Sequence, residues 1–157
     1  MKVAIRPLEE SDALLSYKWR NDSDVWKYTG NKPDKKITLK IEKKWIKTVL
    51  GRQNEKRFAI CIGDEMEYVG NVQLTDITTY NAQFHIFIGR KKYHGMGIGT
   101  KATKLILEYA FKILKIKQIY LKVNPDNIAA VKSYEKCGFE IIERHEKELL
   151  MALKIDK

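Results

Sequence analysis

The sequence predicts a mixed α/β fold in which one central sheet is flanked by helices. Apolar runs of strand length recur along the chain, and segments with the spacing of amphipathic helices lie between them. After an opening antiparallel meander, helices alternate with strands, which suits one mixed sheet. The length of 157 residues favours a single domain, residues 1–157, large enough to bury its own core.

The first half of the chain is expected to form a strand, two helices and a hairpin. The second helix is indicated by Ile37, Ile41, Trp45 and Val49 at near-helical spacing, with Gly51 as its stop. The expected elements are a strand at 3–8, helices at 9–20 and 37–50, and strands at 57–62 and 68–74 joined by a turn at 63–65.

The second half is expected to alternate strands with helices. Its elements are a strand at 83–88, a helix at 101–114, a strand at 118–123, a helix at 127–136, and a closing strand pair at 139–142 and 149–153. The long helix is expected to turn one apolar face inward, made of Ala102, Leu105, Ile106, Tyr109, Ala110 and Ile113.

A glycine-dense turn, residues 93–100, separates the apolar run 84–88 from the long helix. Glycines let a backbone approach a ligand closely, and the first N–H groups of a helix attract an anion. A Walker loop is excluded because Gly99 is followed by Thr100 and then Lys101. A dinucleotide fingerprint is excluded because Thr100 occupies the place of its third glycine.

The turn resembles the pyrophosphate-binding motif of the GCN5-related N-acetyltransferases (GNAT), (Gln/Arg)-x-x-Gly-x-(Gly/Ala). Gly97 and Gly99 match the two glycines, whereas His94 stands where Gln or Arg is usual. Downstream, residues 127–139 resemble the second signature of the family, Asn-x-x-Ala-x-x-x-Tyr-x-x-x-Gly-Phe. Two motifs in the right order are far more specific than one glycine-rich turn.

The resemblance implies a GNAT fold: a mostly antiparallel sheet whose central strand pair splays apart. It also implies acetyl-CoA as cosubstrate and no metal. The implied cofactor-binding residues are the backbone of Phe87 and Ile88 and the loop residues His94, Gly95, Met96, Gly97, Ile98, Gly99 and Thr100. Lys91, Lys92 and Lys101 are candidates for further phosphate contacts, although such lysines are more often simply solvated.

The resemblance makes Tyr134 the candidate catalytic acid, because the matching tyrosine of the family can protonate the departing thiolate. The competing interpretation is a tyrosine packed on a helix face. Asn127 would hydrogen-bond the cofactor arm, and its position also suits a helix N-cap; one side chain can serve both roles.

The general base is harder to assign. In the branch of the GNAT family that the stretch 19–28 resembles, a glutamate commonly begins the central strand. Here Gln83 takes that place, and its side chain cannot accept a proton. Strand alternation puts Gln83, His85 and Phe87 on one face. His85 is therefore a candidate base or water-positioning residue, weighed against a hydrogen-bonded histidine within the sheet.

The stretch 19–28 resembles the branch that contains ribosomal-protein N-terminal and spermidine acetyltransferases. This resemblance makes Trp26 and Tyr28 candidates for the acceptor side, with core packing as the alternative. It favours a protein or peptide N-terminus as the acceptor over a polyamine or an amino sugar. A non-catalytic acyl-CoA-binding module is the competing class, which the Gln83 replacement favours and the intact Tyr134 opposes.

The composition describes an ordinary globular chain with a formal net charge of +10. Nucleic-acid binding is disfavoured because no recognised module for it occurs, whereas a polyanion such as CoA or a nucleotide-sugar would draw on the same field. Cys61 and Cys137 have flanks typical of a core or a helix end, so a reducing cytoplasm is expected. No membrane association is expected, and the oligomeric state stays open, a homodimer included.

Overall fold

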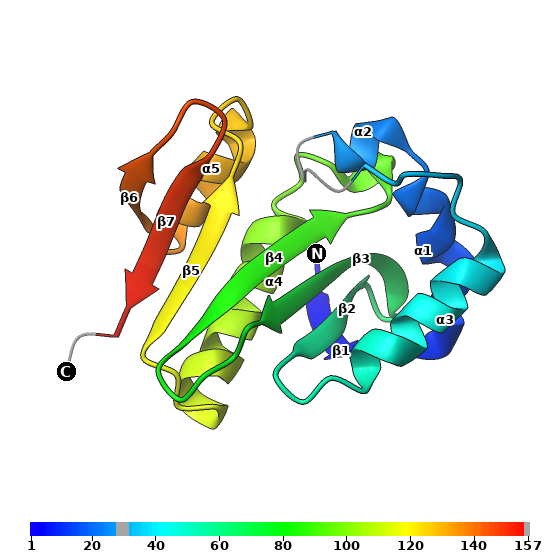
Figure 1. The fold of residues 1–157 in the computed structure, drawn as a ribbon, viewed down its shortest axis with the longest axis horizontal. Helices are drawn as coiled ribbons and strands as arrows, with labels where there is room; N and C mark the ends of the chain where they lie inside the picture. Colours follow the sequence, from blue (N-terminus) through cyan, green and yellow to red (C-terminus); the bar gives the residue numbers. More distant parts are fainter. Residues whose placement is uncertain (28–31, 156–157) are drawn as a thin grey trace.

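A computed structural model describes residues 1–27 and 32–155. Within these residues the strands form one seven-stranded sheet in the order β1-β2-β3-β4-β5-β7-β6 (Figure 1). The strands are β1 (Val3–Pro7), β2 (Lys56–Ile62), β3 (Glu67–Thr75), β4 (Asn81–Ile88), β5 (Gln118–Val123), β6 (Glu140–Arg144) and β7 (Leu149–Lys154). Every recorded pairing is antiparallel except that of β4 with β5, which confirms the expected mixed, mostly antiparallel sheet.

The helices lie between the strands in the expected places. The α-helices are α1 (Ala13–Arg20), α2 (Ser23–Trp26), α3 (Leu39–Leu50), α4 (Ile98–Glu108) and α5 (Ile128–Lys136). The shorter turns are the 3-10 segments η1 (Glu10–Asp12) and η2 (Lys91–Tyr93), and the π-helical segment η3 (Tyr109–Ile113) that continues α4.

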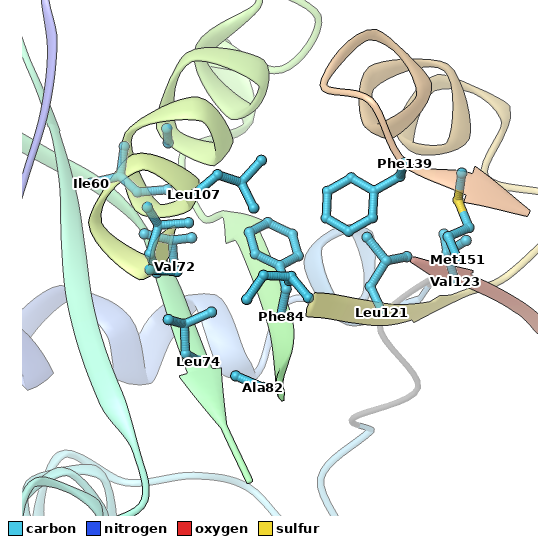
Figure 2. Packing of buried hydrophobic residues seen from close by; sticks show 14 of the residues in the cluster. Ile60, Val72, Leu74, Ala82, Phe84, Leu107, Leu121, Val123, Phe139 and Met151 are labelled. Carbon is cyan, nitrogen blue, oxygen red and sulfur yellow. The ribbon is translucent and has the colours of Figure 1, made fainter. Parts of the chain in front are cut away.

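Strand β2 is buried on both faces, and the alternation of its side chains separates two cores. Ala59 and Cys61 pack with residues of α1 and α3, whereas Ile60 and Ile62 pack under α4. The larger core also contains Phe84 of β4, Leu121 of β5, Met151 of β7 and Phe139, which precedes β6, as Figure 2 shows. The sheet is therefore covered on one face by α1 and α3 and on the other by α4 and α5.

Three helices begin at residues whose side chains accept a hydrogen bond from the first turn. Asp22 caps α2, Thr38 caps α3 and Asn127 caps α5. Such caps satisfy backbone N–H groups that the helix itself leaves unpaired. Helix α4 begins instead at Gly97, and no side chain caps it.

Some sequence expectations were wrong in detail. The helix expected over residues 9–20 is broken into η1 and α1, and the long helix starts at Ile98 rather than at residue 101. Its inward face was also misassigned, because Leu105 and Ile113 are 37% and 68% exposed while Thr103 and Leu107 are buried. Helical spacing locates an apolar stripe only to within one neighbouring row of side chains.

In the described part of the chain, none of the helices has the length and apolar character needed to cross a bilayer.

Gly89 adjoins the end of β4 where the ring of Trp19 leaves no room for a side chain. A Cβ atom built on Gly89 would overlap the Trp19 ring, which is 8% exposed and lies 4.7 Å from the Tyr68 ring centroid. We expect Gly89→Ala to lower the free energy of unfolding by about 1–3 kcal/mol through overpacking, measured by urea denaturation. Gly51→Ala is the control, since its Cβ would lie 3.4 Å from its nearest neighbour, and a similar loss in both variants would contradict the prediction.

Candidate functional site

Strand β4 pairs fully with one neighbour and only briefly with the other. Its contact with β3 runs from Gln83 opposite Thr75 to Ile88 opposite Gly70. Its parallel contact with β5 is confined to residues 81–83, beyond which the two strands diverge in Figure 1. The expected splay of the central pair is confirmed, and it leaves the backbone of β4 beyond Gln83 without a partner strand on that side.

A cleft of about 660 Å³ lies beside this free edge of β4, and we call it the glycine-loop cleft. Its walls come from the end of β4, the turn before α4, and α5, with α2 at the rim. The lining includes Ile86, Phe87, Ile88, Tyr93, His94, Gly95, Met96, Gly97, Ile98, Gly99, Thr100, Asn127, Ala130, Ser133 and Tyr134. All the residues expected to bind the cofactor therefore meet in one place.

The turn before α4 has the geometry of an anion site. Gly95 and Gly97 both have φ of 78°, which side chains rarely tolerate, and a Cβ at Gly95, Gly97 or Gly99 would meet no protein atom. The N–H groups of Ile98, Gly99 and Thr100 belong to the first turn of α4 and have no intrahelical partner. With the positive end of the helix dipole, these donors fit a phosphate.

The lysines around the cleft divide into two groups. Lys27, Lys132 and Lys136 line it. Lys91, by contrast, forms ion pairs with Asp22 and Asp24 at 3.1 and 3.4 Å, and Lys101 donates to the carbonyl of Met1 at 3.0 Å. Of the lysines singled out from the sequence, Lys91 and Lys101 thus connect parts of the fold, while Nζ of Lys92 lies 5.0 Å from the ring centroid of the adjacent Tyr93. Helix α5 supplies cations that the sequence did not single out.

Tyr134 lies on α5 with its ring between two phenylalanines. Ring centroids of Phe84 and Phe139 are 5.8 and 6.0 Å away, both edge-on. Burial raises the pKa of its phenol to about 12, so Tyr134 keeps its proton at neutral pH and can donate it. The hydroxyl groups of Thr100 and Ser133, 2.6 Å apart, connect the start of α4 to α5 and hold the tyrosine helix against the glycine turn.

Asn127 and His94 each have a structural contact in addition to their place in the cleft. The side chain of Asn127 accepts from the N–H of Ala130 at 3.3 Å, which confirms the N-cap interpretation. The ring of His94 donates through Nε2 to the carbonyl of Ile88 at 2.8 Å. The glycine turn is therefore tied to the end of β4, and this contact engages one of the carbonyl groups expected to pair with a cofactor.

A second cleft, of about 600 Å³, lies on the α3 side of β4, and we call it the tryptophan cleft. Val25 and Phe87 line both clefts, so the two adjoin at these side chains. The lining consists of Arg20, Val25, Trp26, Lys32, Pro33, Asp34, Lys35, Ile37, Glu42, Trp45, Arg57, Asn71, Gln73, Thr75, His85 and Phe87.

The two candidates for the base differ in position. His85 lines the tryptophan cleft, and its Nε2 lies 3.0 Å from Oγ1 of Thr75. Burial, followed by the nearby Arg57, lowers the pKa of His85, so its imidazole is neutral at physiological pH. Gln83 lies two residues before His85 on β4, opposite Thr75 of β3 and Tyr120 of β5. It is absent from the described lining of both clefts.

Of the two expected acceptor-side aromatics, Trp26 lies in the wall of the tryptophan cleft, with Nζ of Lys32 5.8 Å from its ring. Tyr28 falls outside the described residues.

Sequence reasoning missed the polar centre of the tryptophan cleft. Glu42 is 2% exposed, and it accepts hydrogen bonds from Ser16 at 2.7 Å and Arg20 at 2.6 Å. The sequence did indicate that Glu42 is buried, because Glu42 lies four residues before Ile46 and therefore on the same apolar face of α3. The guanidinium carbons of Arg20 and Arg57 lie 4.8 and 4.9 Å from the Trp45 ring centroid, which only the tertiary fold brings about.

Comparisons with known proteins agree with this geometry. A family model described as an acetyltransferase (GNAT) domain matches residues 2–140. The spermidine N(1)-acetyltransferase of Escherichia coli K12 is 31% identical over 142 residues, covering 88% of this chain and 73% of that protein. The probable N-acetyltransferase YjcK of Bacillus subtilis is 30% identical, with 87% and 80% covered. A Vibrio cholerae spermidine N-acetyltransferase, solved with CoA and spermine, superposes with a TM-score of 0.87 at 24% identity, covering 97% and 95%.

The lowered pKa of His85 predicts how stability depends on pH. The unfolded chain takes up this proton from about pH 6.5 downward, whereas the folded chain resists it to lower pH. Unfolding therefore becomes more favourable as the pH falls through this window. We expect the stability of His85→Gln to fall less than that of the wild type between about pH 7.5 and 5.5 in urea denaturation, and parallel pH profiles would contradict the assignment.

Proposed function

Because this chain belongs to the GNAT family of acetyltransferases, we propose that it transfers the acetyl group of acetyl-CoA to the primary amine of a small molecule. The observation that carries this proposal is the meeting of two clefts at Val25 and Phe87, beside the free edge of β4. One cleft has the anion-binding turn and the other has polar and aromatic walls. A donor and an acceptor bound in them would approach each other at Phe87, which favours direct transfer by proximity.

The glycine-loop cleft suits the phosphates and the extended arm of CoA. The free N–H groups at the start of α4 and the lysines Lys132 and Lys136 would hold phosphates. The backbone groups of β4 that face away from β3 beyond Gln83 would hydrogen-bond the amide groups of the arm, as a missing strand would. Acetyl-CoA supplies the acetyl group as an activated thioester.

Tyr134 would serve as the acid. Its Oη keeps its proton at neutral pH, as an ordinary phenol with a pKa of about 10 also does, and burial raises the pKa further, to about 12. Its helix lines the cleft next to the glycine turn. A positioned donor of this kind would protonate the sulfur that leaves. The two phenylalanine rings fix the orientation of the phenol.

His85 would act on the acceptor side. A neutral imidazole can take a proton from the acceptor amine or order a water that does so. Its place in the tryptophan cleft supports this role, and the contact with Thr75 holds the ring in one orientation. Gln83 cannot accept a proton and is absent from the described lining of both clefts, so His85 would act in place of the glutamate that is common in the resembled branch.

The comparisons favour a small-molecule acceptor over the protein or peptide N-terminus suggested by the stretch 19–28. The matched relative from Escherichia coli is named for spermidine, and the superposed Vibrio cholerae enzyme was solved with spermine. Polyamines therefore belong among the first acceptors to test, together with amino sugars and free peptide N-termini.

Turnover is measured as acetyl-CoA-dependent thiol release with spermidine, an amino sugar, an amino acid and short peptides as acceptors. We expect at least one small amine to be acetylated, with peptides slower than the best small amine. The acetylated product is identified by mass spectrometry. Tight binding of acetyl-CoA without turnover on any small amine would overturn the proposal and favour the non-catalytic module.

Tyr134→Phe removes only the phenolic proton. We expect kcat to fall about 100-fold, the lower end of the range for general acid catalysis, while the affinity for acetyl-CoA changes little. Tyr109→Phe is the matched control, because Tyr109 packs edge-on against Phe58, 5.2 Å away, and does not line the described clefts. An unchanged kcat in Tyr134→Phe would assign Tyr134 to packing alone.

A further inference from the structure

The tryptophan cleft has more cationic side chains than carboxylates. Among its described lining residues, Arg20, Lys32, Lys35 and Arg57 are cationic, and the carboxylates are Asp34 and Glu42. Glu42 forms an ion pair with Arg20 at 2.6 Å, and Glu55 forms one with Arg57 at 2.8 Å. Lys32 and Lys35 therefore supply the cationic excess, and the formal charge of the whole chain, +10, has the same sign. A concave site lined by one sign of charge concentrates ligands of the opposite sign.

The charge of Glu42 is already used within the protein. Its side chain is 2% exposed, and its two oxygens accept from Nη1 of Arg20 at 2.6 Å and from Oγ of Ser16 at 2.7 Å. Asp34, Lys32 and Lys35 all lie on the exposed rim, where water screens their charges. The described lining therefore presents no buried carboxylate that could receive the additional ammonium groups of a polyamine.

The two arginines are held in place and keep donors to spare. Both guanidinium groups lie within 5 Å of the Trp45 ring centroid, and Arg57 also donates to Glu55 through Nε and Nη2 at 2.9 and 2.8 Å. A guanidinium has five N–H groups, so each arginine retains donors beyond these contacts. Guanidinium groups with fixed orientation match the planar geometry of carboxylate and phosphate oxygens.

We infer that the acceptor amine of the proposed reaction carries an anionic group, a carboxylate or a phosphate, which binds to Arg20, Arg57, Lys32 and Lys35 of the tryptophan cleft. This inference rests on the proposed function and narrows its acceptor. It sets the chain apart from its relative named for spermidine, a polycation, because a second ammonium group would meet guanidinium groups at close range. Nearby cations also favour the neutral form of the reacting amine, which is its nucleophilic form.

The first test compares acceptors with and without an anionic group. Glucosamine 6-phosphate is paired with glucosamine, an amino acid with its amide, and spermidine serves as the polycation. We expect kcat/KM to be at least tenfold higher for the anionic member of one pair than for its neutral member. The pair with the larger ratio shows whether the preferred group is a phosphate or a carboxylate. Spermidine should be the poorest acceptor. The preference should shrink as salt rises from about 0.05 to 0.5 M. A polycation or a neutral amine as the best acceptor overturns the inference.

The second test removes cations from the rim of the cleft. The double variant Lys32→Gln/Lys35→Gln should lower the preference for the anionic acceptor several-fold, mainly through KM, and leave the neutral partner nearly unaffected. Lys40→Gln/Lys43→Gln is the matched control, because it removes the same charge from exposed positions of α3 outside the described lining. Equal effects of both variants would show a general field and no specific contact, and would overturn the inference.

Binding separates failure of the inference from failure of the proposed function. Calorimetric titration of glucosamine 6-phosphate, glucosamine and spermidine into CoA-saturated protein reports the preference without turnover. Preferential binding of the phosphate ester without acetylation of any amine would support an anion-binding tryptophan cleft and overturn the transferase proposal. Acetylation of spermidine with no binding preference for the phosphate ester would support the transferase proposal and overturn the inference of an anionic acceptor. Absence of both binding and turnover would overturn both.

Discussion

The functional site depends on the early separation of β4 from β5. In a continuous sheet the backbone groups of β4 would be paired on both sides, and no extended ligand could be held there. Here the parallel pairing ends at Gln83, while β3 supports the other side of β4 up to Ile88. The free edge is rigid because it belongs to a well-supported strand. It can bind a ligand without first being ordered, which lowers the entropic cost of binding.

Two further constraints turn this edge into a site with two sides. Helix α4 begins at an uncapped glycine turn, so its first N–H groups face the glycine-loop cleft. Phe87 lies at the end of β4, with its ring packed edge-on at 6.1 Å from the Trp19 ring, and contributes to both clefts. The glycine-loop cleft and the tryptophan cleft therefore adjoin at Phe87 of β4 and Val25 of α2.

Most residues of the candidate site could be predicted because they belong to local sequence motifs. Residues that reach the site through long-range contacts could not be predicted from the sequence. Gly97, Thr100, Asn127 and Tyr134 were identified from the resemblance to the two family motifs, because each motif lies within one short segment of the chain. Arg20, Glu42 and Arg57 come from three separate elements, and nothing in their immediate neighbours announces that they share a cleft. The exposed Leu105 and Ile113 show the same limit within one helix, since the sequence gives the period of the stripe more reliably than its phase.

The sequence by itself determined the mixed α/β class, the order of the elements, the anion-binding turn and the family, because these follow from local periodicity, glycine placement and spaced motifs. The tertiary structure alone decided where β4 leaves β5, that Lys91 pairs with Asp22 at 3.1 Å, and that Arg20, Arg57 and two lysines line one cleft. These features arise from distant segments that meet only when the two faces of the sheet are covered. Charge at a site is a sum over neighbours in space, and the neighbours exist only in the fold.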